Sequence, residues 1–260
     1  PLAVTDCLNF GNPEKPEIFF QFREACRGIA DACAALGTPV TGGNVSFYNE
    51  SPSGAVFPTP MIGMVGVLAD VSRRVPAGFQ RPGDRILVLG HCNGAMGGTQ
   101  YLSWATGETF GPPPPVDLAA ERALVDFLVE AAGRGLLRSA HDVAEGGLAI
   151  ALVEASLAGP ARLGCSADLS VLTRRVEPVQ LFFAEDQGRA VVSCDPSKAD
   201  EVAQLASRRG VPASPVGHVG ESGGVVRLAV NGRALERPVD RLADIYERAI
   251  PRRMERPAGA

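Results

Sequence analysis

The sequence contains few of the residues on which several kinds of binding site depend. Its 260 residues include one tryptophan, three tyrosines and three histidines, and the net charge is −4. A nucleic-acid-binding surface needs clustered basic residues and aromatic side chains that stack on bases, whereas this chain has no Lys/Arg run and only Trp104 as a large platform. No apolar run approaches the roughly 20 residues of a membrane span. We therefore expect neither nucleic acid nor a membrane as a partner.

Cysteine and histidine occur without the spacing of a metal site. The chain has six cysteines and no C-x-x-C pair, and its three histidines are far apart in the sequence. A zinc site is therefore not indicated. The same cysteine pattern fits reduced thiols better than a disulfide framework, so we expect a cytoplasmic location.

The chain is long enough for one large domain or two small ones, and 45% of its residues are hydrophobic. Turn-forming residues are dense at 75–84, which predicts a boundary near Phe79 and domains at 1–78 and 79–260. Strand and helix patterns alternate beyond the boundary, which indicates an α/β or α+β fold. The first residues, 1–6, look like the end of a buried strand, so we expect the chain to be a fragment of something longer.

Two segments rich in oxygen-bearing side chains flank one predicted helix. Asp6 is expected at the end of the first strand and opens a loop, the helix runs over Pro16–Leu36, and the pair Gly42-Gly43 follows. Glycines can turn backbone N–H groups toward an anion, and the next residues offer oxygen ligands: Asn44, Ser46, Asn49 and Glu50. This combination suits a phosphate accompanied by Mg²⁺. The alternative is a Gly-Gly turn between two strands and a surface turn at Asp6.

The second domain repeats this arrangement. A short strand ending at His141-Asp142 precedes Gly146-Gly147, which open a helix. A histidine beside an aspartate suggests acid/base chemistry, but a histidine that is hydrogen-bonded for packing is the interpretation we favour. The glycine-rich loop at 93–99 lacks a P-loop pattern, so a structural turn is preferred there to an anion cradle.

Local signals also place individual elements in this domain. Asp117 is predicted to cap a helix, and Asn231-Gly232 predicts a hairpin between two strands. A further helix is expected over Val239–Ile250.

Four segments resemble a known family in both order and spacing. They are Asp6-Cys-Leu-Asn-Phe-Gly-Asn-Pro-Glu14, Gly42-Gly-Asn-Val-Ser-Phe-Tyr-Asn-Glu50, Ser139-Ala-His-Asp-Val-Ala-Glu-Gly-Gly-Leu148 and Phe183-Ala-Glu-Asp-Gln-Gly-Arg189. Together they are similar to the second half of the synthetase subunit of phosphoribosylformylglycinamidine synthases, over nearly the whole chain. The resemblance implies an aminoimidazole ribonucleotide synthetase-like α/β (α+β) fold, with a partial barrel-forming N-terminal domain followed by an α/β sandwich.

The family's chemistry is the ATP-dependent conversion of formylglycinamide ribonucleotide to its amidine, with ammonia that a glutaminase subunit releases from glutamine. By resemblance, Asp6 and Gly43 match ATP contacts, Asn44 matches a Mg²⁺ ligand and Ser46 matches a substrate contact. The catalytic histidine and several Mg²⁺ ligands belong to the family's N-terminal half, so no catalytic residue is assigned here. The implied partners are that half, the glutaminase subunit and a small accessory subunit.

Four other residues match the family less directly. Asp142, Glu185, Asp186 and Gln187 align with pseudo-symmetric counterparts of metal and substrate residues, and they are expected to line an auxiliary nucleotide pocket. One alternative is another ATP-dependent enzyme on the same fold, such as a selenophosphate synthetase or a thiamin monophosphate kinase. The other is a non-catalytic half that binds nucleotide and supplies an interface.

Overall fold

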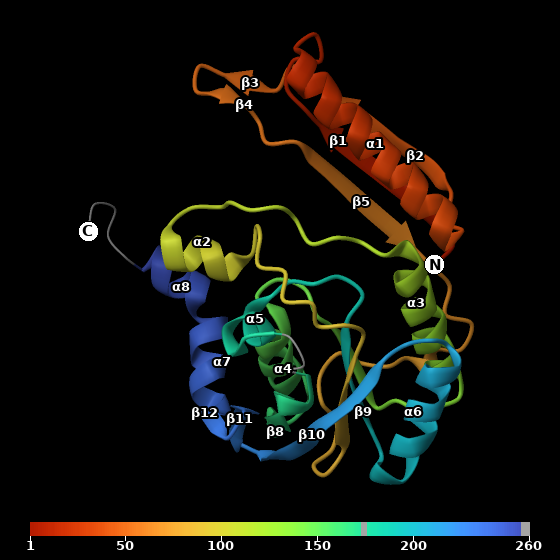
Figure 1. Ribbon diagram of the computed structural model, residues 1–260, viewed down its shortest axis with the longest axis vertical. Coiled ribbons are helices and arrows are strands. Elements are labelled where there is room, and N and C mark those ends of the chain that lie inside the picture. The colour runs from red at the N-terminus through yellow and green to blue at the C-terminus, as the bar shows by residue number, and fades with distance from the viewer. Residues whose placement is uncertain (173–175, 256–260) are drawn as a thin grey trace. The chain divides into compact units, whose positions relative to one another are not determined.

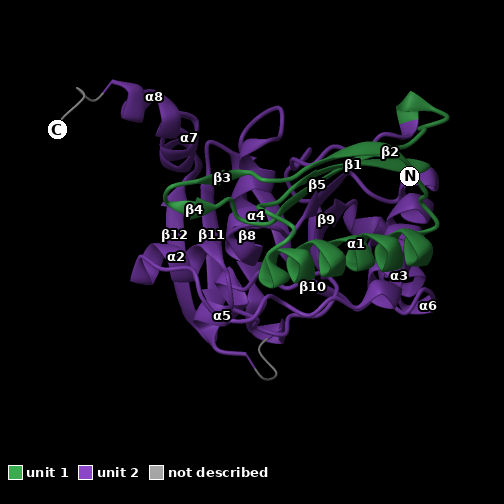
Figure 2. Cartoon of the chain, turned by 90° about the horizontal axis from the view of Figure 1, so that it is seen from above, with its two compact units in different colours: residues 1–72 green, residues 73–260 purple. Residues whose placement is uncertain are grey.

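The computed structural model describes residues 1–172 and 176–255, and the chain divides into two compact units, residues 1–72 and 73–260 (Figure 2). This division lies a few residues before the expected boundary at 78/79. The connecting residues pack with the second unit, where Pro76 O accepts a hydrogen bond from Ala140 N at 3.0 Å and Phe79 is completely buried. Each unit has its own core.

The first unit is an open three-stranded sheet with one long helix (Figure 1). The strand order is β2-β1-β5, in which β1 pairs with β2 in parallel and with β5 antiparallel. The elements are β1 (Ala3–Asn9), α1 (Pro16–Leu36), β2 (Val40–Ser46), β3 (Glu50–Ser51), β4 (Gly54–Ala55) and β5 (Thr59–Val65), and the short η1 (Val71–Arg73) spans the division. Leu8, Phe10 and Ile18 form the buried centre between α1 and the sheet.

Helix α1 has the predicted bounds for the expected reasons. Pro16 occupies the first turn, where a missing N–H leaves no hydrogen bond unmade, and Gly37 ends the helix with φ 69°. The two segments beside it differ from the expectation. Asp6 lies inside β1 rather than at its end, and Gly42-Gly43 lie inside β2 rather than in a loop. Both corrections have one cause, because the two strands form a continuous parallel ladder across these residues.

The second unit is a seven-stranded mixed sheet in the order β12-β11-β8-β10-β6-β9-β7. Its strands are β6 (Arg85–Leu89), β7 (Ser139–Asp142), β8 (Leu163–Asp168), β9 (Ala190–Cys194), β10 (Ala213–Ser222), β11 (Val225–Val230) and β12 (Arg233–Pro238). Its helices are α2 (Gln100–Thr106), α3 (Leu118–Gly133), α4 (Gly147–Leu157), α5 (Pro178–Phe183), α6 (Ala199–Arg208), α7 (Val239–Glu247) and α8 (Ala249–Met254), with 3₁₀ turns η2 (Leu169–Leu172) and η3 (Pro196–Lys198).

Alternation along β6 divides the core of this unit into two layers. Ile86 and Val88 pack with buried residues of α4, α5 and α7, whereas Leu87 and Leu89 pack with those of α3 and α6. Successive side chains of a strand point to opposite faces, so a wholly aliphatic strand indicates a sheet covered on both sides. The expected α/β sandwich is therefore present.

The local signals in this unit are confirmed with one difference. The Asp117 carboxylate accepts hydrogen bonds from Ala119 N at 3.0 Å and Ala120 N at 3.1 Å at the start of α3. Asn231 and Gly232, with φ 49° and 78°, turn the chain from β11 to β12. The helix expected over Val239–Ile250 is divided at Arg248 into α7 and α8.

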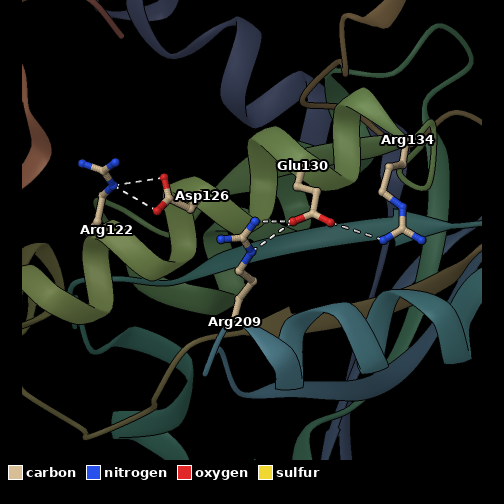
Figure 3. A network of polar contacts seen from close by, with 5 residues as sticks. All are labelled: Arg122, Asp126, Glu130, Arg134 and Arg209. Carbon is tan, nitrogen blue, oxygen red and sulfur yellow. Dashed lines mark hydrogen bonds and ion pairs between the residues drawn. The ribbon is translucent and has the colours of Figure 1, made fainter.

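An ion-pair network joins α3 to the end of α6 at the surface (Figure 3). Glu130 accepts hydrogen bonds from Arg209 Nε at 3.0 Å and from Arg134 Nη1 at 3.4 Å. The hydrogen bond from Arg209, followed by weaker effects that include Arg134, lowers the pKa of Glu130. Because the Glu130 side chain is 31% exposed and its arginine partners are more exposed, the network stabilises the fold only weakly.

Replacing Glu130 with glutamine is expected to lower the melting temperature slightly at pH 7. A carboxyl group whose pKa is lowered by folding stabilises the protein above its unfolded pKa of about 4.3, and this contribution is lost as the pH falls through the folded pKa. Calorimetric unfolding of both proteins at pH 7 and pH 3 should show the difference fading in acid. The same difference should shrink in about 1 M salt. A difference independent of pH and salt would contradict the electrostatic origin.

Candidate functional site

In the first unit, Asp6 and Gly43 are direct neighbours across the parallel β1–β2 pair. A Cβ atom added to Gly43 would lie 2.0 Å from Asp6 Oδ1 and 2.5 Å from Asp6 O. Real Cβ contacts are not that short, so the position needs glycine because of close approach and not because of positive φ. The carboxylate thus lies directly against the glycine backbone.

The sheet divides the four predicted residues between its two faces. Leu8 packs toward α1, and Asp6 shares its side of β1 because side chains alternate along a strand. The pKa of the Cys26 thiol in α1 is raised by burial and then by the Asp6 carboxylate, which agrees with this placement. Asn44 and Ser46 lie on the opposite face, paired with Cys7 and Asn9. The structure therefore places Asp6 beside Gly43 on the α1 face of the sheet. Asn44 and Ser46 lie together on the other face.

The loop after β2 uses some of its oxygen atoms internally. Glu50 accepts hydrogen bonds from Asn12 N at 2.9 Å and Lys15 Nζ at 3.0 Å, and these two donors lower its pKa. Asn49 Nδ2 donates to Ser46 O at 3.0 Å. Glu50 and Asn49, which the sequence offered as metal ligands, thus hold the loop together, while Asn44 remains exposed.

The second unit has a hollow of about 450 Å³ at the end of β7 and the start of β9. Leu124, Val125 and Leu128 of α3 form an apolar wall. The polar wall includes three of the predicted residues, Asp142, Glu185 and Gln187, together with Glu121, His141 and Glu145. We call this hollow the β7 pocket.

Asp186 has a different position from the other three. It is 2% exposed, and its carboxylate accepts hydrogen bonds from Asn93 N at 2.9 Å, Gly94 N at 3.0 Å and Ala95 N at 2.9 Å. The backbone N–H groups of residues 93–95 form a cradle around this carboxylate, so the glycine-rich loop at 93–99 is structural, as the sequence favoured, and holds an internal side chain. Asp186 supports the β7 pocket from behind rather than lining it.

Glu185 ties two helix starts to the β7 pocket. Its Oε1 accepts hydrogen bonds from Gln100 N at 2.9 Å, in the first turn of α2, and from Gly146 N at 2.8 Å, at the N-cap of α4. Carboxylates are stabilised at helix N-termini, where backbone N–H groups lack partners. Gly146, which the sequence placed between an acid and the start of a helix, thus donates its N–H to the Glu185 carboxylate of the same unit.

Arg189 and Glu121 line the β7 pocket, and neither was singled out from the sequence. Arg189 is 4% exposed and donates from Nε to Asp186 O at 3.1 Å and from Nη2 to Ala184 O at 2.7 Å, so it fixes the loop that carries Glu185 and Gln187. Glu121 lines the pocket from α3, and burial raises the pKa of its carboxyl group. Arg189 is the last residue of the segment Phe183–Arg189 that resembles the family, so the sequence contained a signal for this residue. No local pattern marks Glu121.

His141 has the structural environment that the sequence favoured. Its Nδ1 lies 2.7 Å from Asp142 O, and its Nε2 lies 3.9 Å from Glu154 Oε2. The ring is thus held by its neighbours.

Within residues 1–172 and 176–255, no group of three or more His, Cys, Asp or Glu side chains is arranged to hold a metal ion. In the same parts of the chain, no helix has the length and apolar character to cross a membrane.

Comparison with known proteins places these features in a family. The profile described as "AIR synthase related protein, C-terminal domain" matches residues 81–229, and the corresponding N-terminal domain profile matches residues 1–68. A relative named phosphoribosylformylglycinamidine synthase subunit PurL, from Moorella thermoacetica, is 48% identical over 235 residues, covering 90% of this chain and 31% of the relative. A second PurL, from Parafrankia sp., is 46% identical over 97% of this chain and 32% of that relative. The chain thus spans about a third of the length of these curated relatives.

Solved structures show the same fold. A structure described as T. maritima PurL complexed with FGAR matches with a TM-score of 0.74 and 25% identity, over 94% of this chain and 39% of that one. The hydrogenase maturation protein HypE of E. coli matches with a TM-score of 0.65 and 16% identity, over 92% of this chain and 72% of that one. This match shows likeness of fold alone. On the strength of the profile matches over both of its domains, the chain belongs to the AIR synthase related protein family.

Proposed function

We propose that this chain is part of an ATP-dependent ligase of purine biosynthesis. The reaction converts formylglycinamide ribonucleotide, ATP and ammonia from glutamine to formylglycinamidine ribonucleotide, ADP and phosphate. The proposal is supported by the PurL relatives at 46–48% identity and by structures of T. maritima PurL described as complexes with ATP and with FGAR. Because the chain spans about a third of those relatives, the complete activity is proposed for a protein that includes it.

The observation that carries the proposal is the paired arrangement of β1 and β2. A glycine pressed against the Asp6 carboxylate, with Asn44 and Ser46 on the next two outward positions of β2, is a specific arrangement that generic strand pairing does not require. Asp6 and Gly43 are proposed as ATP contacts, with Gly43 acting through its backbone because the Asp6 carboxylate faces α1, and the Ser46 hydroxyl would donate to the ribonucleotide. In phosphoryl transfer the protein mainly positions reactants and neutralises charge.

The residues present fit a Mg²⁺ ion that keeps most of its water. Mg²⁺ takes one or two protein oxygens beside phosphate oxygens and waters, and it rarely needs a cage made only of protein. Asn44 offers an exposed amide oxygen, whereas Asp6 is on the other face of the sheet and Glu50 is paired with Lys15. When bound, the ion would neutralise phosphate charge, and the chain's contribution is the placement of Asn44.

We also propose the N-terminal half of the same subunit as a partner of the first unit. Met61 and Val65 on β5 are 59% and 63% exposed, and they lie on the sheet face opposite α1. An open sheet with apolar residues on its uncovered face is suited to pairing. A glutaminase subunit and a small accessory subunit are proposed as further partners, in view of the structure described as PurLQS of T. maritima. A cytoplasmic location is part of the same proposal.

For the β7 pocket we retain the auxiliary nucleotide as a proposal, with a modified set of residues. Asp142, Glu185 and Gln187 line the pocket, and Asp186 holds their loop. A non-catalytic nucleotide-binding role for the chain is the alternative, and it predicts ATP binding that is insensitive to changes at Asn44.

Replacing Asn44 with alanine is expected to weaken Mg²⁺–ATP binding about tenfold or more, since loss of a group that orients a metal commonly has an effect of this size. Titration calorimetry of the purified protein at several Mg²⁺ concentrations measures the loss, which should lessen as Mg²⁺ rises. Val45→Ala is the matched control, because the neighbouring side chain faces the other side of β2. Unchanged affinity and Mg²⁺ dependence in Asn44→Ala would refute the assignment.

A further inference from the structure

Tyr48 has an unusual backbone conformation just beyond the predicted site residues. Its φ is 58°, and among the described residues only Arg162 and Asn231 share positive φ without being glycine. Asn231 belongs to a hairpin turn, and the Arg162 guanidinium forms an ion pair with Glu247 at 2.7 Å. A bulky aromatic residue in this region is strained, and such strain persists only where the surroundings enforce it.

The surroundings of Tyr48 enforce the conformation through the backbone. Tyr48 N donates to Gly11 O at 3.0 Å, Asn49 N donates to Phe10 O at 3.2 Å, and Glu50 N donates to Tyr48 O at 2.9 Å. Gly11 has no room for a side chain, because a Cβ there would lie 2.7 Å from Ala55 Cβ. The loop after β2 is thus fastened to the end of β1.

The tyrosine ring takes no part in the packing that this loop secures. Phe47 turns inward and meets the Phe22 ring at 4.9 Å, whereas the Tyr48 side chain is left 60% exposed. Its hydroxyl is 3.5 Å from Glu14 Oε1, which is a long contact. Glycine would adopt the same backbone with no strain, so neither the turn nor the core explains a tyrosine here.

We propose that Tyr48 is a binding residue that stacks on the base of the ATP molecule, an inference that rests on the proposed function. An exposed aromatic ring offers a face on which a purine base stacks. Tyr48 is four residues beyond Asn44, a distance of at most about 14 Å along the chain. A nucleotide with its phosphates at Asn44 could therefore place its base at Tyr48. The other substrate, formylglycinamide ribonucleotide, has no base to stack.

The test compares Mg²⁺–ATP with Mg²⁺–tripolyphosphate, which has the phosphates but no base. Calorimetric titration of the purified protein should show Tyr48→Ala weakening ATP binding about tenfold while leaving tripolyphosphate within about twofold. Tyr48→Phe keeps the ring and should bind ATP like the parent. Tyr48→Gly should lose ATP affinity as the alanine variant does, yet melt no lower than the parent because the strain is relieved.

The outcomes separate this proposal from the one on which it rests. If the parent protein binds Mg²⁺–ATP and Tyr48→Ala binds it equally well, the stacking role is refuted and the proposed function stands. Equal loss of ATP and tripolyphosphate also refutes stacking, because the ring would then act on the phosphates or on the loop. If a full-length protein that includes this chain binds no Mg²⁺–ATP, both proposals fail.

Discussion

Replacing Asp186 with alanine is expected to lower the free energy of unfolding by about 3–5 kcal/mol, because three backbone donors lose their acceptor and each such donor costs about 1–3 kcal/mol when it is buried. The substitution leaves the N–H groups of Asn93, Gly94 and Ala95 without their acceptor at a site where Asp186 is 2% exposed. Each unsatisfied buried donor is costly, and water does not easily replace the carboxylate. Chemical denaturation monitored by circular dichroism measures the change.

Asp142→Ala is the matched control for this prediction. Asp142 comes from the same set of expected pocket residues, but its side chain is 79% exposed, so the change should stay within about 0.5 kcal/mol. Hydrogen exchange should also accelerate at residues 93–95 in Asp186→Ala and not in the control. A loss below about 1 kcal/mol, or exchange that is unchanged at 93–95, would show that the cradle does not depend on Asp186.

Replacing Gly43 with alanine is expected to destabilise the first unit by about 2–3 kcal/mol and to abolish measurable Mg²⁺–ATP binding, since overpacking of a close contact has a cost of this size. The new methyl group would meet Asp6 Oδ1 at 2.0 Å and Asp6 O at 2.5 Å. The carboxylate could rotate away, but the backbone oxygen could do so only if β1 and β2 separate. Thermal unfolding measures the loss of stability, and hydrogen exchange over residues 38–46 measures the separation of β1 and β2. Titration with ATP measures the loss of binding.

Gly42→Ala provides an unusually close control. A Cβ at Gly42 would have no heavy atom within 4 Å, and its φ is not in the positive region. Alanine should therefore be accepted there with unchanged or slightly higher stability. If both variants behave alike, the close contact between Gly43 and Asp6 is not what requires a glycine at position 43.

These two predictions separate residues that build a site from residues that face a ligand. Asp186 and Gln187 belong to one motif in the sequence, yet Asp186 is an internal acceptor for a backbone cradle and Gln187 lies on the pocket wall. A motif identifies the family without distinguishing these roles. The distinction needs burial and hydrogen-bond partners.

The sequence alone determined the elements whose signals are local. Pro16, the helical spacing of apolar residues and Gly37 set the bounds of α1, and Asn231-Gly232 set the β11–β12 turn. The four matched segments also identified the family and, with it, the fold of both units. Capping and turn geometry depend on residues close together in the chain, and the order and spacing of the matched segments can be read along the chain without the folded structure.

Only the tertiary structure decided what the glycines and acids do. Gly42-Gly43 form a strand because β1 supplies hydrogen-bond partners, and Gly43 is needed because Asp6 lies against it. Asp186 is internal because a loop more than 90 residues earlier surrounds it with N–H donors. Contacts between residues so far apart leave no periodic trace in the sequence, and their geometry is fixed only when the strands and loops pack together.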